Sequence, residues 1–536
     1  MDTVLFSDSI NDLETNLKDK LDITNISLYC PILDNLNDFN KGIDNYIFKS
    51  KYFVSELLDN KTESKKCQDT PYIKREYEAK IKNNYSKKYS KKTVFIKVNP
   101  ILDVISFILD QYQIETNGLP NYKVSVTSNY INNFNNQAYI DAFFSFLSSK
   151  LTESGKAPCF PLFYGTLSAL MNHYKFDITE DYSKIKYHNK FQYNLNKTFS
   201  LDEIDIETDS SGYTTVSNSD SELSLDLQNF DNSLDNINNL DIQELEFDST
   251  NFSQIEPSKE SSVDPSKESS VEPSIEPSIE SLLNITEIDN YHNFSEIIDD
   301  NNTFKYCVLN NFPTQLIFME KLEFTLDDLI ENNEYTISNQ EWNSILFQIC
   351  FGLAVAQKSY SFVHNDLHSQ NIMFVKTKEE FLFYEYNSKY YKVPTFGKIA
   401  KIIDFGRATF EYNNDIYFSS VFDEGGDAEG QYDYPEDNNY KNCKIRPNPS
   451  FDLSRLASTI IEHFDTKHPV YKLLKGWLID KYGNNLTTHE DNFNLYLKIA
   501  KNVNSAIPKK QLTKNIFKEF VILKKKINSK HFIFKY

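Results

Sequence analysis

The chain has 536 residues, which is more than one compact core requires and predicts two or three folding units. Its formal net charge is −21, but residues 201–300 hold 26 acidic residues against two lysines, whereas the remainder holds 54 basic and 51 acidic residues. A nearly neutral body with one acidic segment does not predict nucleic-acid binding by bulk charge.

The six cysteines lie far apart and form no C-x-x-C pair, which argues against a disulfide framework and favours a reducing compartment. The N-terminus lacks the basic-then-apolar pattern of a secretory signal. The longest apolar stretch, Ile345 to Ala356, is too short to span a bilayer. We therefore expect a cytoplasmic protein that is neither secreted nor transmembrane.

The N-terminal part of the chain predicts three elements. Residues 1–90 mix short apolar clusters with Asn- and Lys-rich stretches and predict no defined unit. The β-branched and aromatic residues at 93–98 predict a strand that carries Lys97. Apolar side chains at three- and four-residue spacing predict a helix over 136–151, and the run at 162–165 predicts another strand.

Residues 201–300 are rich in Asp, Glu, Ser and Asn and contain a degenerate repeat, E-P-S-K-E-S-S at 256–262 and D-P-S-K-E-S-S at 264–270. Low hydrophobicity combined with high net charge cannot offset the entropy of ordering, so we predict a disordered insertion. A tolerated loop expansion is the favoured interpretation. A segment that binds a partner or accepts phosphate is the alternative.

Regular structure is predicted again from residue 303. The pattern indicates a strand at 315–319, a short helix at 325–330 and a long amphipathic helix at 342–356. The acidic insertion therefore lies inside a domain, between a β-containing first half and a helix-rich second half.

The most informative stretch is F-V-H-N-D-L-H-S-Q-N-I-M-F at residues 362–374. An apolar helix ends, a polar loop presents His, Asp and Asn, and an apolar strand follows. Asp366 and Asn371 are five residues apart and can face one cavity. A carboxylate oxygen of Asp366 can receive or orient the proton of an acceptor hydroxyl, and the amide oxygen of Asn371 suits a hard cation such as Mg²⁺.

A second carboxylate, Asp404, ends an apolar strand in the sequence K-I-I-D-F-G at 401–406. Phosphoryl transfer needs a metal ion that bridges the phosphates, a base or positioning group, and a cation on the donor phosphates. Asp404 and Asn371 would form the metal site, Asp366 would position the acceptor, and Lys97 could supply the cation.

These motifs resemble those of the protein-kinase superfamily. Residues 364–371 resemble its H-R-D-L-x-x-x-N catalytic loop, and residues 404–406 resemble its D-F-G turn. The resemblance implies an α+β, two-lobe, kinase-like fold with an atypical N-lobe, ATP and Mg²⁺ as cofactors, and a protein substrate. It also implies catalytic-loop roles for His364, Asp366 and His368.

Further segments fit the same pattern. Met319 to Leu322 looks like the hinge between the lobes, where the backbone of Glu320 and Leu322 would meet adenine. The sequence Y-P-E at 434–436 resembles the A-P-E close of an activation segment, and Asp452 matches the helix aspartate that braces the catalytic loop.

The resemblance places the N-lobe at residues 91–200 and 301–322 and the C-lobe at 323–536. The segment between the two motifs is about twenty residues longer than is usual for kinases. Its aromatic-rich content at 381–391 suggests an extra hairpin.

The sequence also departs from the family pattern. No glycine lies between Gly42 and Gly118, so the Gly-rich loop that should cover the phosphates is missing or replaced. Asp141, on the helix at 136–151, is the candidate partner of Lys97 in place of a glutamate, and a position on a solvated helix face is its alternative.

The catalytic loop departs as well. Asn365 replaces the arginine of the H-R-D motif, so activation by a phosphorylated loop that docks there is not supported. His368 stands where Ser/Thr kinases usually have a lysine, and D-L-H-x-x-N looks like the form found in aminoglycoside and choline phosphotransferases. With P-T-F-G-K at 394–398 and G-D-A-E-G-Q-Y-D at 426–433, the chain looks like the kinase-like proteins of giant DNA viruses of the mimivirus type.

Three hypotheses follow. The first is a Ser/Thr protein kinase, placed in the host cytoplasm or virion if the source is viral. The second is a small-molecule phosphotransferase, which His368 favours and Asp452 disfavours. The third is a pseudokinase scaffold, which the missing glycines favour and the intact Asp366, Asn371 and Asp404 disfavour.

Overall fold

The computed structural model describes residues 4–6, 10–32, 46–58, 75–112, 118–120, 130–205, 207–208, 214–215, 303–434, 444–486 and 492–536. They belong to one compact unit. The predicted acidic insertion at 201–300 lies outside the described residues, except for short pieces at its start.

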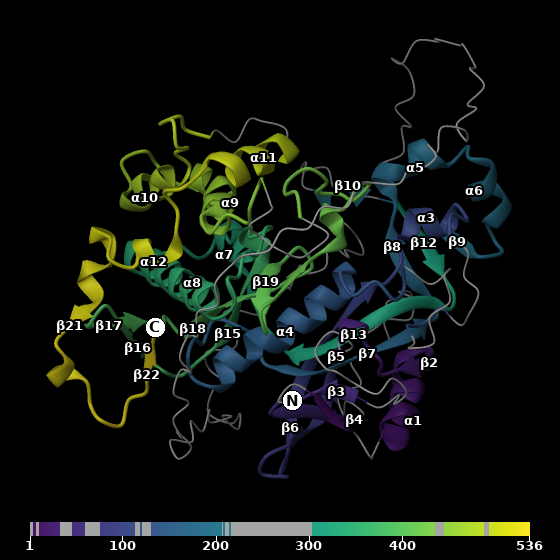
Figure 1. Ribbon diagram of the computed structural model, residues 1–536, viewed down its shortest axis with the longest axis horizontal. Helices are drawn as coiled ribbons and strands as arrows, with labels where there is room; N and C mark the ends of the chain where they lie inside the picture. The colour runs from purple at the N-terminus through teal and green to yellow at the C-terminus, as the bar shows by residue number, and fades with distance from the viewer. Residues whose placement is uncertain are drawn as a thin grey trace, which may run out of the picture. The chain divides into compact units, whose positions relative to one another are not determined.

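The first lobe is built on a six-stranded sheet in which every pair of neighbours is antiparallel (Figure 1). In spatial order its strands are β2 (Ile23–Ser27), β7 (Phe163–Met171), β13 (Phe312–Glu320), β6 (Tyr89–Pro100), β5 (Glu76–Asn83) and β4 (Tyr52–Leu57). The strands predicted at 93–98 and 315–319 are confirmed within β6 and β13. The strand predicted at 162–165 is confirmed as β7, which begins one residue later.

The region before residue 90, which the sequence left undefined, supplies three of these six strands. Helix α1 (Ile10–Leu21) packs beside β2 and β4, and β1 (Val4–Phe6) pairs with β3 (Tyr46–Phe48). The sheet of the first lobe therefore begins well ahead of residue 91.

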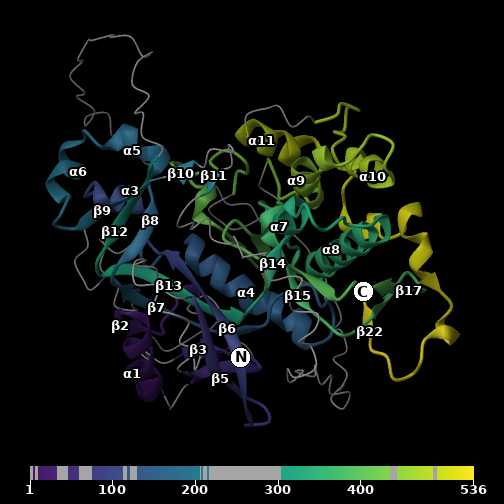
Figure 2. The same ribbon diagram turned by 180° about the vertical axis from the view of Figure 1, so that it is seen from behind.

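Helix α4 (Gln137–Glu153) confirms the predicted helix and lies between the sheet and the second lobe. The side chain of Asn136 caps its N-terminus by accepting a hydrogen bond from the backbone of Ala138. The helix contacts β7 and β13 on one side and α8 (Asn339–Tyr360) on the other (Figure 2). Most of its side chains are buried. Residues carried by α4 are therefore held rigidly between the two lobes.

A smaller antiparallel sheet extends the first lobe. Its strands, in spatial order, are β8 (Tyr174–Asp177), β12 (Thr303–Leu309) and β9 (Phe199–Asp205). The nearby short elements are α3 (Val104–Ile108), α5 (Thr179–Ile185), α6 (Asn189–Asn194), β10 (Glu207–Thr208) and β11 (Thr214–Thr215). This sheet flanks the chain positions between which the acidic segment is inserted.

The second lobe is mainly helical. The predicted helices at 325–330 and 342–356 are confirmed as α7 (Leu326–Glu331), which a Thr325 capping box starts, and α8. Beyond them lie α9 (Phe451–Ile460), α10 (Pro469–Trp477), α11 (Asn492–Asn502), α12 (Pro508–Gln511) and the 3₁₀ turns η7 (Ile461–His463), η8 (Asn515–Phe520) and η9 (Lys524–Lys526).

Two small sheets complete this lobe. One consists of β14 (Phe324–Thr325), β15 (Ile372–Lys376) and β18 (Lys398–Ile402). The other confirms the extra hairpin, β16 (Phe381–Tyr386) with β17 (Lys389–Pro394), joined by β21 (Val521–Ile522) and β22 (Ile533–Lys535).

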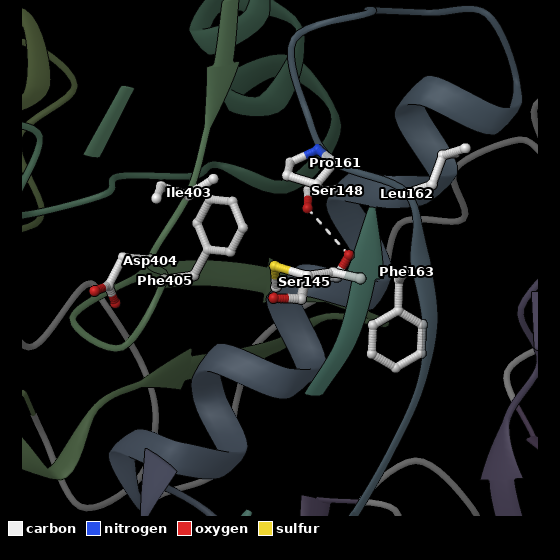
Figure 3. Close-up of a pocket in the computed structure, with 9 residues that line it drawn as sticks. Ser145, Ser148, Pro161, Leu162, Phe163, Ile403, Asp404 and Phe405 are labelled. Atoms are coloured by element: carbon white, nitrogen blue, oxygen red, sulfur yellow. Dashed lines mark hydrogen bonds between the residues drawn. The ribbon is translucent and has the colours of Figure 1, made fainter. Parts of the chain in front are cut away.

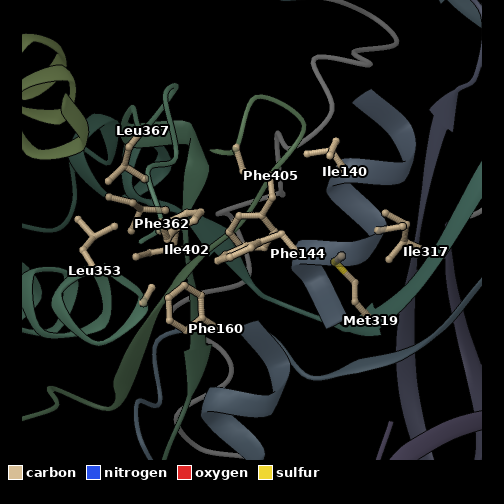
Figure 4. Close-up of a cluster of buried hydrophobic side chains, with 14 of the residues drawn as sticks. Ile140, Phe144, Phe160, Ile317, Met319, Leu353, Phe362, Leu367, Ile402 and Phe405 are labelled. Atoms are coloured by element: carbon tan, nitrogen blue, oxygen red, sulfur yellow. The ribbon is translucent and has the colours of Figure 1, made fainter. Parts of the chain in front are cut away.

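Buried aromatic and aliphatic side chains connect the two lobes through α4. Phe144 of α4 stacks on Phe362 with ring centroids 4.1 Å apart, and its ring lies 4.9 Å from that of Phe405 (Figure 4). The cluster reaches Met319 on the first lobe and Leu353 on the second. Within the described ranges, no helix combines the length and apolar content needed to cross a membrane.

Candidate active site

The loop at residues 364–371 follows the C-terminus of α8, and Asp452 of α9 holds its backbone by hydrogen bonds. The Asp452 carboxylate accepts the backbone N–H of His364 at 3.0 Å and that of Asn365 at 3.1 Å. Burial raises the pKa of the Asp452 carboxyl to about 7, although both backbone donors act against that rise. The predicted bracing contact of Asp452 is therefore present.

His364 is fully buried and joins the loop to the strand before Asp404. Its Nε2 lies 2.8 Å from the carbonyl oxygen of Ile403, and its Nδ1 accepts the backbone N–H of Asp366 at 3.3 Å. Burial lowers the pKa of His364, so the neutral imidazole satisfies both contacts. The sequence grouped His364 with the catalytic residues, but its position makes it a positioning residue.

Asp366 projects from the loop with its side chain 25% exposed. Its Oδ1 accepts a hydrogen bond from the hydroxyl of Tyr496, and its Oδ2 lies 3.8 Å from Nε of Arg407. Tyr496 was not foreseen from the sequence because it is 130 residues away along the chain. Arg407 directly follows the D-F-G turn, but its approach to Asp366 was not foreseen either. The carboxylate that we expected to position an acceptor is thus held on two sides.

Asn371 lies next to Asp404 because strands β15 and β18 are paired. Ile372 pairs with Ile402, and the backbone N–H of Ile403 donates to the carbonyl of Asn371 at 3.1 Å. The Asn371 Nδ2 donates to the carbonyl of Asp366 at 2.9 Å and lies 3.1 Å from Nε2 of His368. The side-chain nitrogen is thereby occupied, and the two turns that carry the predicted metal ligands meet at one place.

Burial lowers the pKa of His368, with opposing effects from the Asp366 and Asp404 charges. A neutral His368 can accept the hydrogen bond from Asn371 Nδ2, which a protonated ring cannot. The structure therefore places His368 where it orients the amide of Asn371.

Lys97 of β6 lies between two carboxylates from different parts of the chain. Its Nζ is 2.7 Å from Oδ2 of Asp141 and 2.9 Å from Oδ1 of Asp404. Burial lowers the pKa of Lys97, but the two carboxylates outweigh it and leave the pKa raised. Burial raises the pKa of Asp404, but Lys97 outweighs it and holds the pKa at about 2. Both groups are therefore charged at neutral pH.

Asp141 is the central acceptor of this region, with only 1% of its surface exposed. Besides Lys97 it accepts Asn99 Nδ2 at 2.8 Å and the backbone N–H of Phe405 at 3.0 Å. The predicted pairing of Asp141 with Lys97 is present, and the alternative of a solvated helix face is wrong. The same carboxylate also holds the turn that follows Asp404.

A small cavity opens behind this turn (Figure 3). Asp404 and Phe405 lie at one end, Leu162 and Phe163 lie at the other, and Ser145 of α4 lies between them. Asp404 has a left-handed backbone with φ of +64°, which Asp adopts more readily than most residues. The turn thereby directs the Asp404 carboxylate toward Lys97 while Phe405 packs into the core.

In the segment expected to form the hinge, the backbone N–H of Glu320 already has a hydrogen-bond partner. Its backbone N–H donates to the carbonyl of Leu162 at 2.9 Å, so this amide is not available to adenine. Its carboxylate binds Nζ of Lys401 at 3.1 Å and the backbone N–H of Leu162 at 3.1 Å. The backbone N–H of Leu322 has no hydrogen-bond partner among the described residues and remains the candidate adenine contact.

Asn365 links the catalytic loop to the segment after the D-F-G turn. This buried residue donates through Nδ2 to the carbonyl of Arg407 at 2.9 Å and accepts the hydroxyl of Tyr432 at 2.8 Å. The segment continues as the hairpin β19 (Thr409–Tyr412) and β20 (Asp415–Phe418), followed by η5 (Ser420–Phe422). A neutral amide thus makes this connection without a phosphate group.

Two other expectations fall on positions that the structure does not describe. The loop between β4 and β5, where phosphate-covering glycines would be sought, spans residues 59–74 and lies outside the described residues. In the sequence Y-P-E at 434–436, only Tyr434 is described, and its ring stacks on Phe418 with centroids 4.1 Å apart.

The site combines a strand lysine paired with a helix carboxylate, a D-F-G turn whose aspartate also contacts that lysine, and an H-x-D-x-x-x-x-N loop held by Asp452. These are the features of a protein-kinase-like site. The chain accordingly resembles the protein-kinase superfamily, including its mimivirus-type members.

Comparisons with known proteins give partial matches. No family model matches the chain. The serine/threonine-protein kinase haspin of Bos taurus is 34% identical over 120 residues, which are 22% of this chain and 15% of haspin. "Putative serine/threonine-protein kinase R301" of Acanthamoeba polyphaga mimivirus is 31% identical over 166 residues, 26% of this chain and 41% of that protein.

Among solved structures, vaccinia related kinase 3 aligns over 38% of this chain and 62% of its own, with 12% identity and a TM-score of 0.20. A similarity of that size carries no functional information. The chain spans less than half of the length of the curated relatives described above.

Proposed function

We propose that this protein is a phosphotransferase that moves the γ-phosphate of Mg²⁺-ATP to a serine or threonine hydroxyl of a protein. The observation that carries the proposal is the convergence of Lys97, Asp404 and Asn371 beside Asp366. These side chains come from β6, from the turn after β18 and from the catalytic loop. Convergence of this kind supports a phosphoryl-transfer site rather than isolated turns.

The residues present fit a magnesium ion. The Asp404 carboxylate, with a pKa of about 2, and the amide oxygen of Asn371 are the hard oxygen donors that Mg²⁺ prefers. These two residues would hold the ion, which neutralises charge on the phosphates when bound. Lys97 would contact the donor phosphates, and the backbone of Leu322 would meet adenine.

The carboxylate of Asp366 orients the acceptor hydroxyl and takes its proton as the hydroxyl oxygen forms a bond to the γ-phosphorus. The bond from the γ-phosphorus to the β,γ-bridging oxygen breaks in the same step, and ADP leaves. His364, Asp452 and Asn365 hold the loop in place, so catalysis rests on preorganised charge rather than on a covalent intermediate. The hydrogen bond from the backbone N–H of Phe405 to Asp141 holds the D-F-G turn next to Lys97.

Transfer of ³²P from γ-labelled ATP to a mixture of generic protein substrates tests the proposal, with Asp366→Asn as the matched inactive variant. We expect labelled phosphoserine or phosphothreonine with the wild type and a loss of about a thousandfold or more with D366N. Transfer only to small hydroxyl compounds would replace the proposal with the small-molecule hypothesis, which His368 favours. Stabilisation by Mg²⁺-ATP without any transfer would replace it with the scaffold hypothesis.

A further inference from the structure

Tyr496 of α11 meets the carboxylate of Asp366 although nothing in the sequence around it indicates a role in the site. Its hydroxyl donates to Oδ1 of Asp366 and accepts a hydrogen bond from Nε of Arg455 at 2.9 Å. Arg455 belongs to α9, the same helix that carries Asp452. A chain of hydrogen bonds thus runs from a guanidinium group through a phenol to the carboxylate.

The Tyr496 ring is fixed in place. It is 8% exposed, its centroid lies 5.1 Å from the guanidinium carbon of Arg455, and it lies 5.6 Å from the ring of Phe451. A ring that merely blocked the acceptor position would have to swing out and give up both contacts and the hydrogen bond from Arg455. The packing instead favours a permanent partner of Asp366.

We propose that Tyr496 is a positioning residue of the phosphotransfer site, which fixes the rotamer of Asp366 through Oδ1. This leaves Oδ2, which Arg407 approaches only to 3.8 Å, for the acceptor hydroxyl. This inference rests on the proposed function. The cation of Arg455 polarises the phenol and strengthens its donation to the carboxylate. Burial, followed by the charge of Asp366, raises the pKa of Tyr496 to about 12, so the hydroxyl keeps its proton at physiological pH.

Tyr496→Phe removes only the hydroxyl. Loss of a hydrogen bond to the charged carboxylate should raise the free energy of the transition state and lower kcat about tenfold to a hundredfold. KM for ATP should stay unchanged, because Tyr496 contacts the acceptor side of the site. A purely structural role would instead lower the thermal unfolding midpoint and raise KM for ATP together with any loss of kcat.

The control is Tyr390→Phe on β17, where the lost hydroxyl bond goes to Glu385 at 3.1 Å, away from the loop. Arg455→Lys keeps the positive charge but loses the Nε donor, and it should lower kcat in the same direction by a smaller factor. In the double variant Y496F/R455K, the losses should not add, because both changes interrupt one chain of hydrogen bonds. Far-ultraviolet circular dichroism verifies that each variant is folded.

Two results would overturn the inference while the wild type transfers phosphate. An unchanged kcat in Y496F would show that Tyr496 does not position Asp366. A higher kcat with a lower KM for the acceptor would show that Tyr496 blocks the acceptor position. If the wild-type chain transfers nothing, the proposed function itself fails, and this inference fails with it.

Discussion

Replacement of Asp141 by asparagine tests how the two lobes are joined at the nucleotide site. Asn has almost the same size as Asp, so the core around α4 should not be disturbed. The amide oxygen can still accept the backbone N–H of Phe405, which is now at 3.0 Å from Oδ1. The amide nitrogen would then face Nζ of Lys97 and Nδ2 of Asn99. All three groups are hydrogen-bond donors, so both hydrogen bonds to residue 141 would be lost.

The magnitude follows from the burial of this pair. Removing one partner of a buried ion pair destabilises a protein by about 3–5 kcal/mol. Lys97 keeps Asp404 at 2.9 Å and its side chain is 21% exposed, so we expect a loss below that range, about 2 kcal/mol. The same free energy lost from the transition state corresponds to about a thirtyfold lower kcat/KM for ATP.

The assay combines thermal unfolding with initial rates at varied ATP. D141N should unfold at a midpoint a few degrees lower and should lose activity, whereas Asp181→Asn should change neither. Asp181 is a half-buried helix carboxylate 3.2 Å from Lys184, and this surface ion pair serves as the matched control. Wild-type rates and stability in D141N would refute the assignment of Asp141 as the partner of Lys97.

Three other predictions concern single contacts. Because the pKa of His368 in the folded protein lies below the ordinary 6.5, the unfolded chain takes up a proton first as the pH falls. The contribution of His368 to stability is therefore present above pH 6.5 and is lost as the pH falls below that value. His368→Gln should make the free energy of unfolding depend less on pH in this acid range, and an unchanged slope would contradict this. Lys401→Met removes the cation that lies 3.1 Å from the Glu320 carboxylate, and it should lower the free energy of unfolding by about 2–4 kcal/mol, measured in denaturant. An unchanged free energy of unfolding would show that this buried ion pair adds no stability. At Gly352 in α8 an added methyl group would lie 2.7 Å from Cβ of Cys159. Gly352→Ala should therefore lower the free energy of unfolding by about 1–3 kcal/mol, although alanine has the better helix propensity. A more stable variant would show that the core around Cys159 rearranges to accept the methyl group.

The parts of the site that the sequence predicts are local. Asp366 and Asn371 are five residues apart in one loop, and Asp404 follows an apolar strand, so spacing alone indicates their chemistry. The helix that carries Asp141 is equally evident from its apolar periodicity. These signals survive because each depends on fewer than about twenty consecutive residues.

The parts that the sequence did not predict depend on tertiary contacts. Tyr496 reaches Asp366 from a helix 130 residues away, and no periodicity or motif marks it. The backbone N–H of Glu320 is occupied by Leu162 because β7 crosses beside β13, which only the strand pairing shows. Strands β2 and β4 were missed because they are short and a bulge interrupts the pairing, and hence the alternating pattern, of each. Strand β5 was missed because its sequence, E-Y-E-A-K-I-K-N, is rich in Glu and Lys, which are depleted in strands.

Binding of Mn²⁺-ATP, followed by electron paramagnetic resonance, tests the central proposal most directly because Mn²⁺ substitutes for Mg²⁺ at oxygen ligands. We expect the wild type to bind the ion in the presence of ATP, and Asn371→Ala and Asp404→Asn each to weaken it by about tenfold or more. The exposed Asp415→Asn on β20 should bind like the wild type. Equal affinity in all four proteins would contradict a metal site formed by Asn371 and Asp404.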